Sequence, residues 1–220
     1  MTAANALPPT RPAPKFAAEW QPFIPYADEK NCPAHLQPAL DKLKQRMGML
    51  PNSMGLYLHH PAILGTILAM GSGILTSPES TLSRVLKNKL GVICSSTNGC
   101  VYCTTHQCTF LTRDRGLQAE GFGVALEEAR DLIAGTAPGV NDFERVCFDY
   151  ARTASRDSAS VDDALRARMK AHLSPAQIIE LACVVGYWKF INSVHDSLNL
   201  PVEAVNLEAT GYIDAWRHNV

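Results

Sequence analysis

The sequence contains no long hydrophobic run and no block of charge of one sign. Its most apolar stretch, ILGTILAMGSGIL at 63–75, is too short and too rich in glycine to cross a bilayer. The opening residues, MTAANALPPTRPAPKF, lack the apolar core of a secretory signal. The 20 basic and 21 acidic residues give a net charge of −1, which makes nucleic acid or an anionic membrane a poor partner. We therefore expect a cytoplasmic protein with no membrane partner.

The sequence also lacks the period-two alternation of a half-buried strand, and it has no repeat of fixed length. Apolar residues recur instead at intervals of three and four, which indicates helices. The helices predicted in this way span 34–47, 61–75, 77–97, 100–116, 126–134, 142–155, 161–172 and 175–198, with a short turn at 53–58 and a short tail helix after Pro201. The pattern predicts an all-α domain of eight or nine helices.

Short signals set several of the predicted helix ends. SPE at 77–79 combines a cap, a first-turn proline and an acid, which favours a helix start. SPAQ at 174–177 is a capping box. Gly48 and the Asn-Gly pair at 98–99 are typical stop signals.

The first 33 residues form a separate segment, because they hold seven of the chain's 14 prolines. Proline has no N–H donor, so this segment is not expected to be helical. Its apolar side chains, Trp20, Phe23, Ile24 and Tyr26, are unusual for a free linker. We predict a Pro-rich arm at 1–33, disordered over 1–14 and then extended along the body or a neighbouring subunit, and a helical domain at 34–220.

Three of the seven cysteines and one histidine lie in SSTNGCVYCTTHQC at 95–108. On a helix, Cys100 and Cys103 are about 5 Å apart at Cα, a separation that permits a disulfide. A helix N-terminus favours a thiolate, and His106 lies on the same side, where it can hold or accept the thiol proton. Cys108 faces another side of the helix. The predicted catalytic residues are Cys100, Cys103 and His106.

Other uses of this motif fit less well. A metal site would need a fourth ligand, and neither a second CxxC nor an HxxxH is present; His59 and His60 are adjacent and make a poor pair. A thioredoxin-type site needs a strand before the motif, where the sequence predicts helix. Inert buried thiols remain an alternative, although burial does not explain the spacing. We predict no metal and no cofactor.

Structural roles are expected for the remaining cysteines and histidines. Cys94, Cys147 and Cys183 are predicted in the core, Cys32 in a structural or incidental position, and His35, His172 and His218 on the surface. His59 and His60 precede Pro61, which suggests capping or packing. His195 is interpreted as a solvated helix end, although it could also orient a catalytic group.

Three segments occur in an order that resembles the carboxymuconolactone decarboxylase and alkylhydroperoxidase D (AhpD-like) superfamily, in particular its peroxidase-related branch. They are LPNSMGLYLHHPAIL at 50–64, NGCVYCTTH at 98–106 and SPAQIIELACVVGYWKFINSVHDSLNLPVE at 174–203. Asn192 and Asp196 match an Asn and an Asp of the family's closing helix. The resemblance covers about 36–203 and implies an all-α fold around a helical hairpin, assembled as a trimer, dimer or hexamer.

The resemblance also implies a thiol peroxidase or disulfide reductase. In that reaction Cys103 attacks a peroxide, Cys100 condenses with the sulfenic acid, and a thiol or protein reductant restores the dithiol. The helix dipole alone would instead favour Cys100 as the thiolate.

Two relay positions of the family differ in this chain. Asn88 stands where the family has a Glu, and Gln107 stands where better-known members have their His. An amide cannot carry a proton at neutral pH, so a weak or altered activity is also compatible. Asn88, Gln107 and Tyr102 are predicted as supporting residues.

Two other functions compete with the peroxidase. One is a decarboxylase-like enzyme acting on a small lactone acid, although such members typically lack the CxxC. The other is a non-enzymatic oligomer that senses oxidants through its dithiol.

Overall fold

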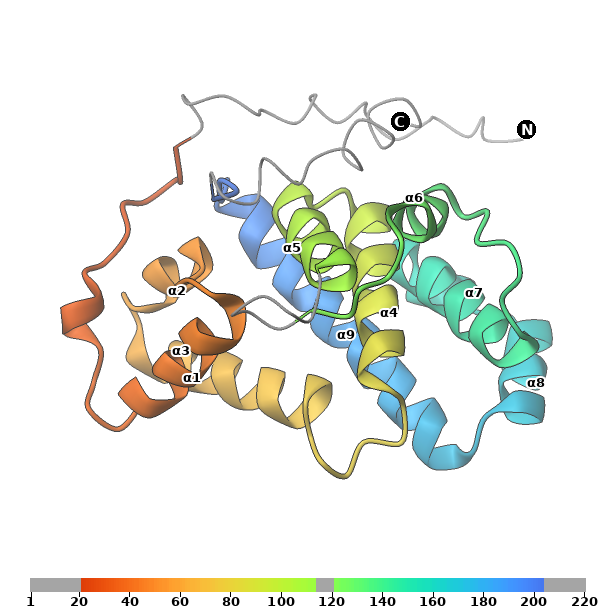
Figure 1. Cartoon of the computed structure of the whole chain (residues 1–220). Helices are drawn as coiled ribbons and strands as arrows, with labels where there is room; N and C mark the ends of the chain where they lie inside the picture. The colour runs from red at the N-terminus through yellow and green to blue at the C-terminus, as the bar shows by residue number, and fades with distance from the viewer. Residues whose placement is uncertain (1–20, 114–120, 204–220) are drawn as a thin grey trace, which may run out of the picture.

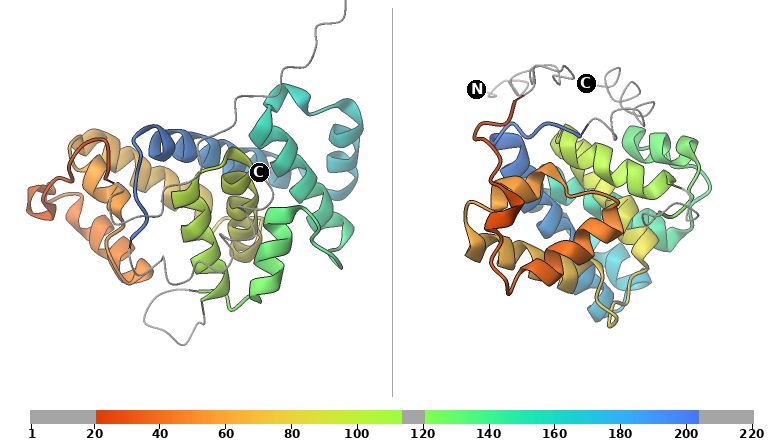
Figure 2. Two further views of the ribbon diagram at one scale, coloured as in Figure 1. Left: turned by 90° about the horizontal axis from the view of Figure 1, so that it is seen from above. Right: turned by 60° about the vertical axis from the view of Figure 1, so that its left-hand side comes forward.

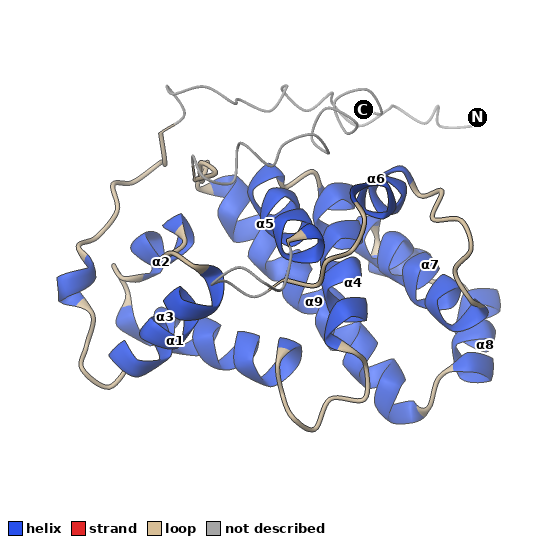
Figure 3. Cartoon of the chain, viewed as in Figure 1, coloured by secondary structure: helices blue, strands red, loops and turns tan. Residues whose placement is uncertain are grey.

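The computed structural model describes residues 21–113 and 121–203. Within these ranges the regular secondary structure is entirely helical and no strand forms (Figure 3). The nine α-helices are α1 (Gln37–Met47), α2 (Asn52–Tyr57), α3 (Pro61–Met70), α4 (Arg84–Asn98), α5 (Val101–Thr112), α6 (Leu126–Ala134), α7 (Asp142–Arg156), α8 (Asp163–His172) and α9 (Pro175–Ser197). Short 3₁₀ turns lie at Glu29–Asn31 and Ser158–Ser160, and a π-helical turn, Gly71–Leu75, extends α3. The predicted all-α class is confirmed.

Helices α4, α5 and α9 form the centre of the molecule (Figure 1). Helices α1 to α3 lie on one side of this centre and α6 to α8 on the other, an arrangement that both views in Figure 2 support. Helix α4 packs against α5, α6, α7 and α9, and every residue from 86 to 96 is buried. A helix enclosed in this way can hold polar side chains only where they find partners.

The α4–α5 hairpin is set by the Asn-Gly pair. Gly99 adopts φ 75°, the left-handed conformation that glycine takes without steric cost. The Gly99 N–H bonds to the Ser96 carbonyl (3.1 Å) and the Cys100 N–H to the Ser95 carbonyl (3.0 Å), which closes α4. Cys100 is then the N-cap of α5, so the first cysteine of the motif stands at the turn itself.

The predicted helix start at 77–79 is wrong. Helix α4 begins at Arg84, and Ser83 is its cap, accepting a bond from the Leu86 N–H at 3.1 Å. Residues before the cap stay non-helical because the Glu180 carboxylate accepts bonds from the N–H groups of Thr81 (2.7 Å) and Leu82 (3.0 Å). A tertiary partner on α9 therefore overrides a local start signal.

Helix α5 ends at Thr112, earlier than predicted, because Arg113 is extended (ψ 135°). The carbonyls at this end are bonded by the returning chain: Phe122 N–H bonds Phe110 (3.1 Å) and Val124 N–H bonds Leu111 (2.9 Å). The predicted end near Gly116 lies outside the described residues.

Other predicted helix ends agree with the structure. Gly48 closes α1 with φ 78°, and the Ser174–Gln177 capping box opens α9. In the described part of the chain, no helix combines the length and the apolar character needed to span a bilayer.

The described part of the arm contacts two separate parts of the helical domain, the segment after α9 and helix α2. Phe23 N–H bonds the Leu198 carbonyl (2.9 Å) after α9, and Ala27 N–H bonds the Gly55 carbonyl (2.9 Å) in α2. Residues 1–20, for which disorder over 1–14 was predicted, and the tail after 203 lie outside the described residues.

Candidate functional site

A cavity of about 270 Å³ lies between α1 to α3 and the central helices. Cys103 and His106 of α5, Tyr57 of α2 and His195 of α9 line one part of it. Cys100 is not among the described lining residues, and both cysteines are almost fully buried (1% and 2% exposed). The CxxC motif thus presents Cys103 to the cavity and keeps Cys100 behind it.

The two cysteines are free thiols, and their side chains are within hydrogen-bonding reach of each other. Cys100 caps α5 and Cys103 is the third residue of the helix, so the hairpin turn alone sets their spacing. Burial, the neighbouring Cys100 and the charge of Asp196 raise the pKa of Cys103 well above its ordinary value. Cys103 therefore rests as a thiol at neutral pH, despite its place in the first turn.

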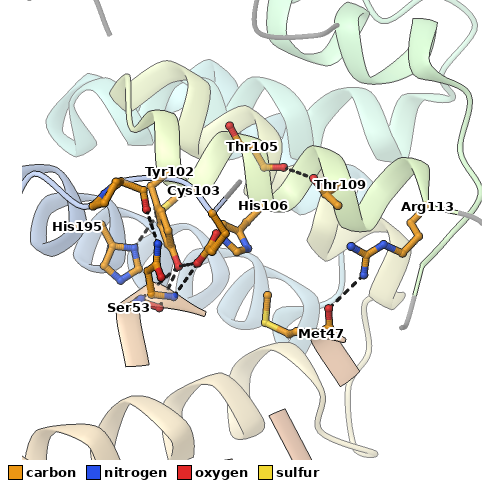
Figure 4. Close-up of polar contacts among 12 residues, drawn as sticks. Met47, Ser53, Tyr102, Cys103, Thr105, His106, Thr109, Arg113 and His195 are labelled. Carbon is orange, nitrogen blue, oxygen red and sulfur yellow. Dashed lines mark hydrogen bonds and ion pairs between the residues drawn. The ribbon is translucent and has the colours of Figure 1, made fainter. Parts of the chain in front are cut away.

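His195 contacts Cys103 directly, as Figure 4 shows. Its Nδ1 lies 3.2 Å from Cys103 Sγ, and its Nε2 lies 2.9 Å from the Tyr57 hydroxyl. Burial, and then the neighbouring His106, lower the pKa of His195 to about 3, against an opposing effect of Glu203. The ring is neutral at pH 7, so one nitrogen donates and the other accepts. Since the thiol supplies its own hydrogen, Nδ1 is the acceptor and Nε2–H donates to Tyr57.

A second network surrounds the carboxylate of Glu203. Oε2 lies 2.6 Å from His106 Nε2, while Oε1 accepts bonds from the Tyr102 hydroxyl (2.9 Å) and the Asn52 N–H (2.6 Å). Burial acts to raise the pKa of Glu203, but His106 and the Asn52 N–H outweigh it and hold the pKa at about 2. The Tyr102 hydroxyl also accepts a bond from the Ser53 N–H at 3.2 Å. These contacts join α2, α5 and the segment after α9.

Asn88 and Gln107, the two positions at which this chain differs from the family's proton relay, are hydrogen-bonded to each other. Asn88 Nδ2 donates to Gln107 Oε1 at 2.6 Å, and both residues line the cavity. Gly91 makes room for this pair, because a Cβ there would lie 2.9 Å from Gln107 Oε1 and 3.0 Å from Trp188 Cε2. The amide pair therefore closes one wall of the cavity.

The predicted site residues lie close together, although the contacts differ from those expected. Cys100, Cys103, Tyr102 and His106 meet at the start of α5, with Asn88 and Gln107 about one turn away. The bond resolved at Cys103 goes to His195, whereas Nε2 of His106 bonds Glu203. A direct role of His106 in holding the thiol proton stays a prediction.

Two structural interpretations were wrong. His195 is not a solvated helix end but only 5% exposed, because α9 turns it toward Cys103. Cys183 is exposed rather than in the core, since it lies on the outer face of α9. Cys94 and Cys147 are buried as predicted, and His60 caps α3 by accepting from the Ile63 N–H at 3.4 Å.

Three residues of the site, Tyr57, His195 and Glu203, were not predicted as catalytic or supporting residues. The sequence contained a signal for His195 only. Trp188, Ile191, Asn192 and His195 are spaced by three and four and are all buried, so helical periodicity places His195 on the inner face of α9. Tyr57 lies in a short helix whose residues 53–57 are all buried, and Glu203 lies in a non-helical segment. Periodicity cannot identify either of these two residues.

In the described ranges, no three His, Cys, Asp or Glu side chains are arranged to hold a metal ion.

Comparison with known proteins gives limited sequence similarity. No family model matches the chain. The uncharacterized protein YnjA of Escherichia coli (strain K12) is 30% identical over 69 residues, which are 31% of this chain and 38% of YnjA. The match thus spans well under half of that relative.

Solved structures share the fold over most of the chain. The debrominase Bmp8 superposes with a TM-score of 0.72 and 21% identity, covering 88% of this chain and 97% of Bmp8. A Bmp8 cysteine-to-alanine variant in complex with 2,3,4-tribromopyrrole gives 0.73 and 20%, with coverage of 88% and 96%. An uncharacterized peroxidase-related protein from Ralstonia eutropha JMP134, described as an alkylhydroperoxidase AhpD core, gives 0.70 and 13%, with coverage of 84% and 94%. The chain has the AhpD-like helical fold, as its sequence predicted.

Proposed function

We propose that this protein is a thiol-dependent oxidoreductase that reduces a peroxide with the Cys100–Cys103 dithiol. The observation that carries the proposal is the 3.2 Å contact between Cys103 Sγ and His195 Nδ1 at the cavity wall. A buried thiol with a raised pKa is unreactive alone, and a neutral imidazole that accepts its S–H can receive the proton while the sulfur attacks.

The reaction proceeds in three balanced steps. The sulfur of Cys103 attacks one peroxide oxygen, the O–O bond breaks, and the thiol proton passes through His195 to the leaving alkoxide, giving a sulfenic acid and an alcohol. The thiol of Cys100 then displaces water from the sulfenic acid and forms the disulfide. Two equivalents of an external thiol, or one protein dithiol, reduce the disulfide and are themselves oxidised.

The assignment of Cys103 as the attacking residue is supported by access. Cys103 lines the cavity, whereas Cys100 lies behind it at the hairpin turn, within reach of the other sulfur. The resemblance gives the same assignment, while the helix dipole alone favoured Cys100. Access to substrate outweighs the dipole because a thiolate that cannot meet the peroxide does not react.

His195 replaces the proton relay that Asn88 and Gln107 cannot provide. Because burial holds the pKa of His195 at about 3, a free imidazolium does not accumulate, and Nδ1 receives the Cys103 proton only as the S–O bond forms, passing it to the leaving alkoxide in the same step. The bond from Nε2 to the Tyr57 hydroxyl orients the ring and fixes its tautomer.

The test follows loss of cumene hydroperoxide with dithiothreitol as reductant. We expect turnover in the wild type, loss of turnover in Cys103→Ser and Cys100→Ser, and a loss of about 10²-fold or more in His195→Gln. Cys183→Ser is the matched control, because it removes an exposed thiol far along α9. A sulfenic acid trapped by dimedone should accumulate at Cys103 in Cys100→Ser.

Two results would contradict the proposal. Formation of one disulfide per chain without turnover would indicate an oxidant sensor. Activity on a lactone acid that survives both cysteine substitutions would indicate the decarboxylase-like alternative. The predicted oligomer of this chain is not needed for any of the steps above.

A second candidate reaction is reductive removal of a halogen from an aromatic ring. It is favoured by the fold shared with a debrominase and by aromatic side chains in the cavity wall, among them Tyr187 and Trp188. Here Cys103 would attack the halogen, the ring carbon would take the proton, and Cys100 would displace halide to give the same disulfide. Bromide release from a brominated phenol under dithiothreitol, set against peroxide turnover by the same preparation, decides between the two.

A further inference from the structure

The charge and composition of the cavity wall point to a substrate class. We propose that the cavity binds a small organic anion, whose apolar body lies on the aromatic rings and whose acid group faces the basic side chains of α1 and the start of α4. This inference rests on the proposed function, because it names the substrate of the same thiol site.

The described part of the cavity wall contains basic side chains and no acidic ones. Lys42, Arg46, Arg84 and Lys87 line the cavity, and none of its described lining residues is Asp or Glu. Lys87 is paired with Glu180 at 2.5 Å, and Lys42, Arg46 and Arg84 are the other basic side chains of the described wall. An arginine can bind a carboxylate through two parallel hydrogen bonds even where it also has another partner.

Aromatic side chains line another part of the described wall, beside aliphatic ones. Phe110, Phe122, Tyr187 and Trp188 line it, and the Arg84 guanidinium lies 5.9 Å from the centre of the Phe122 ring. The volume of about 270 Å³ is at the small end of ligand cavities, which suits one substituted ring or a short branched chain. Hydrogen peroxide alone, hardly larger than a water molecule, would leave most of this space unused.

The hairpin fixes the distance between the basic end and the reactive thiol. Asn88 is bonded to Gln107, so these two residues lie level with each other in the antiparallel pair. Arg84 is four residues before Asn88 and Cys103 is four residues before Gln107, so each lies about 6 Å away, in opposite directions. Arg84 therefore begins roughly 12 Å along the hairpin from Cys103. A substituted aromatic acid and the arginine side chain together can bridge this length.

The binding test uses redox-inert probes and a Cys100→Ser, Cys103→Ser double variant, so that it does not depend on turnover. Calorimetry would compare 4-isopropylbenzoate with 4-isopropylbenzamide, two molecules of nearly equal shape that differ in charge. We expect the acid to bind at least tenfold tighter and to weaken with added salt. Arg84→Gln and Arg46→Gln in this background should remove the preference for the acid over the amide; Lys170→Gln, at an exposed position of α8, should keep it and is the control.

The kinetic test compares cumene hydroperoxide with its para-carboxylate derivative in the wild type. A higher kcat/KM for the carboxylate, lost in Arg84→Gln, supports the inference. Equal or weaker binding of the acid probe overturns it, whatever the peroxidase result. Tenfold tighter acid binding without peroxide turnover would keep the anion site and reject the proposed function.

Discussion

Acidification should destabilise this protein through His195. The imidazole is neutral and buried in the folded chain, with a pKa of about 3, but takes up a proton with an ordinary pKa of 6.5 once unfolded. The unfolded state therefore binds more protons between pH 6.5 and 3, and the free energy of unfolding falls as pH falls through that window. Each pH unit in the window lowers it by about 1.4 kcal/mol. Between pH 7.5 and 5.0, His195 alone should remove about 2 kcal/mol.

The assay is urea unfolding, followed by circular dichroism at pH 7.5 and 5.0 with a reductant present. His195→Gln removes the titrating group but retains hydrogen-bonding capacity toward Cys103 and Tyr57. We expect its loss of stability on acidification to be smaller than that of the wild type by about 2 kcal/mol. His35→Gln, which removes an exposed imidazole before α1, should keep the wild-type pH dependence.

The comparison uses differences between pH values, so a general destabilisation of the variant cancels. An identical pH dependence in the wild type and His195→Gln would refute the reasoning. An NMR titration gives an independent check on the native chain: the His195 ring signal should stay constant from pH 8 to pH 5. A ring that titrates near pH 6.5 would mean that it is not held neutral beside Cys103.

Three further predictions concern the surroundings of the thiols. Alkylation of Cys103 by iodoacetamide, measured by mass spectrometry, should be slow at pH 7 and still rising at pH 9, because burial raises its pKa; a plateau below pH 7 would contradict a resting thiol. Glu203→Gln should lower the free energy of unfolding by about 3 kcal/mol at pH 7. The difference from the wild type should shrink as pH falls from 4.5 to 2, where the folded carboxylate itself takes up a proton. Thermal melts across that pH range measure this difference, and a constant difference would mean that the charge of Glu203 is unimportant. Gly91→Ala should cost about 1–3 kcal/mol by forcing Gln107 and Trp188 apart, whereas Gly186→Ala, where a Cβ meets nothing within 4 Å, should not.

The helices could be predicted from the sequence because most of them bury one face. A buried helical face requires apolar residues at intervals of three and four, and this spacing is visible in the sequence. It failed at 77–79, where a local signal competes with the Glu180 carboxylate of a helix far along the sequence. It also placed the CxxC motif correctly at a helix start, since an Asn-Gly pair and the next residues define that turn locally.

The partners of the motif were harder to foresee. His195 is separated from Cys103 by most of the second half of the chain, and the charge rule for helix ends suggested a solvated position. Its spacing from Trp188 and Asn192 argued for the inner face, and this periodicity was the better guide. Tyr57 and Glu203 join the site only through tertiary packing, which a single sequence does not encode in any local pattern.

Helix α2 supplies Tyr57, yet its six residues are too few to persist as a helix without support. It is clamped between two distant parts of the chain: Ala27 on one side, and Pro201 and Glu203 on the other, through the Gly55 carbonyl and Asn52. A tag, cleavage or crosslink that displaces either terminal segment would therefore also displace α2, and with it the Tyr57 hydroxyl that is hydrogen-bonded to His195. Deuterium uptake in α2 should report such damage sooner than uptake in the hairpin that carries the sulfurs.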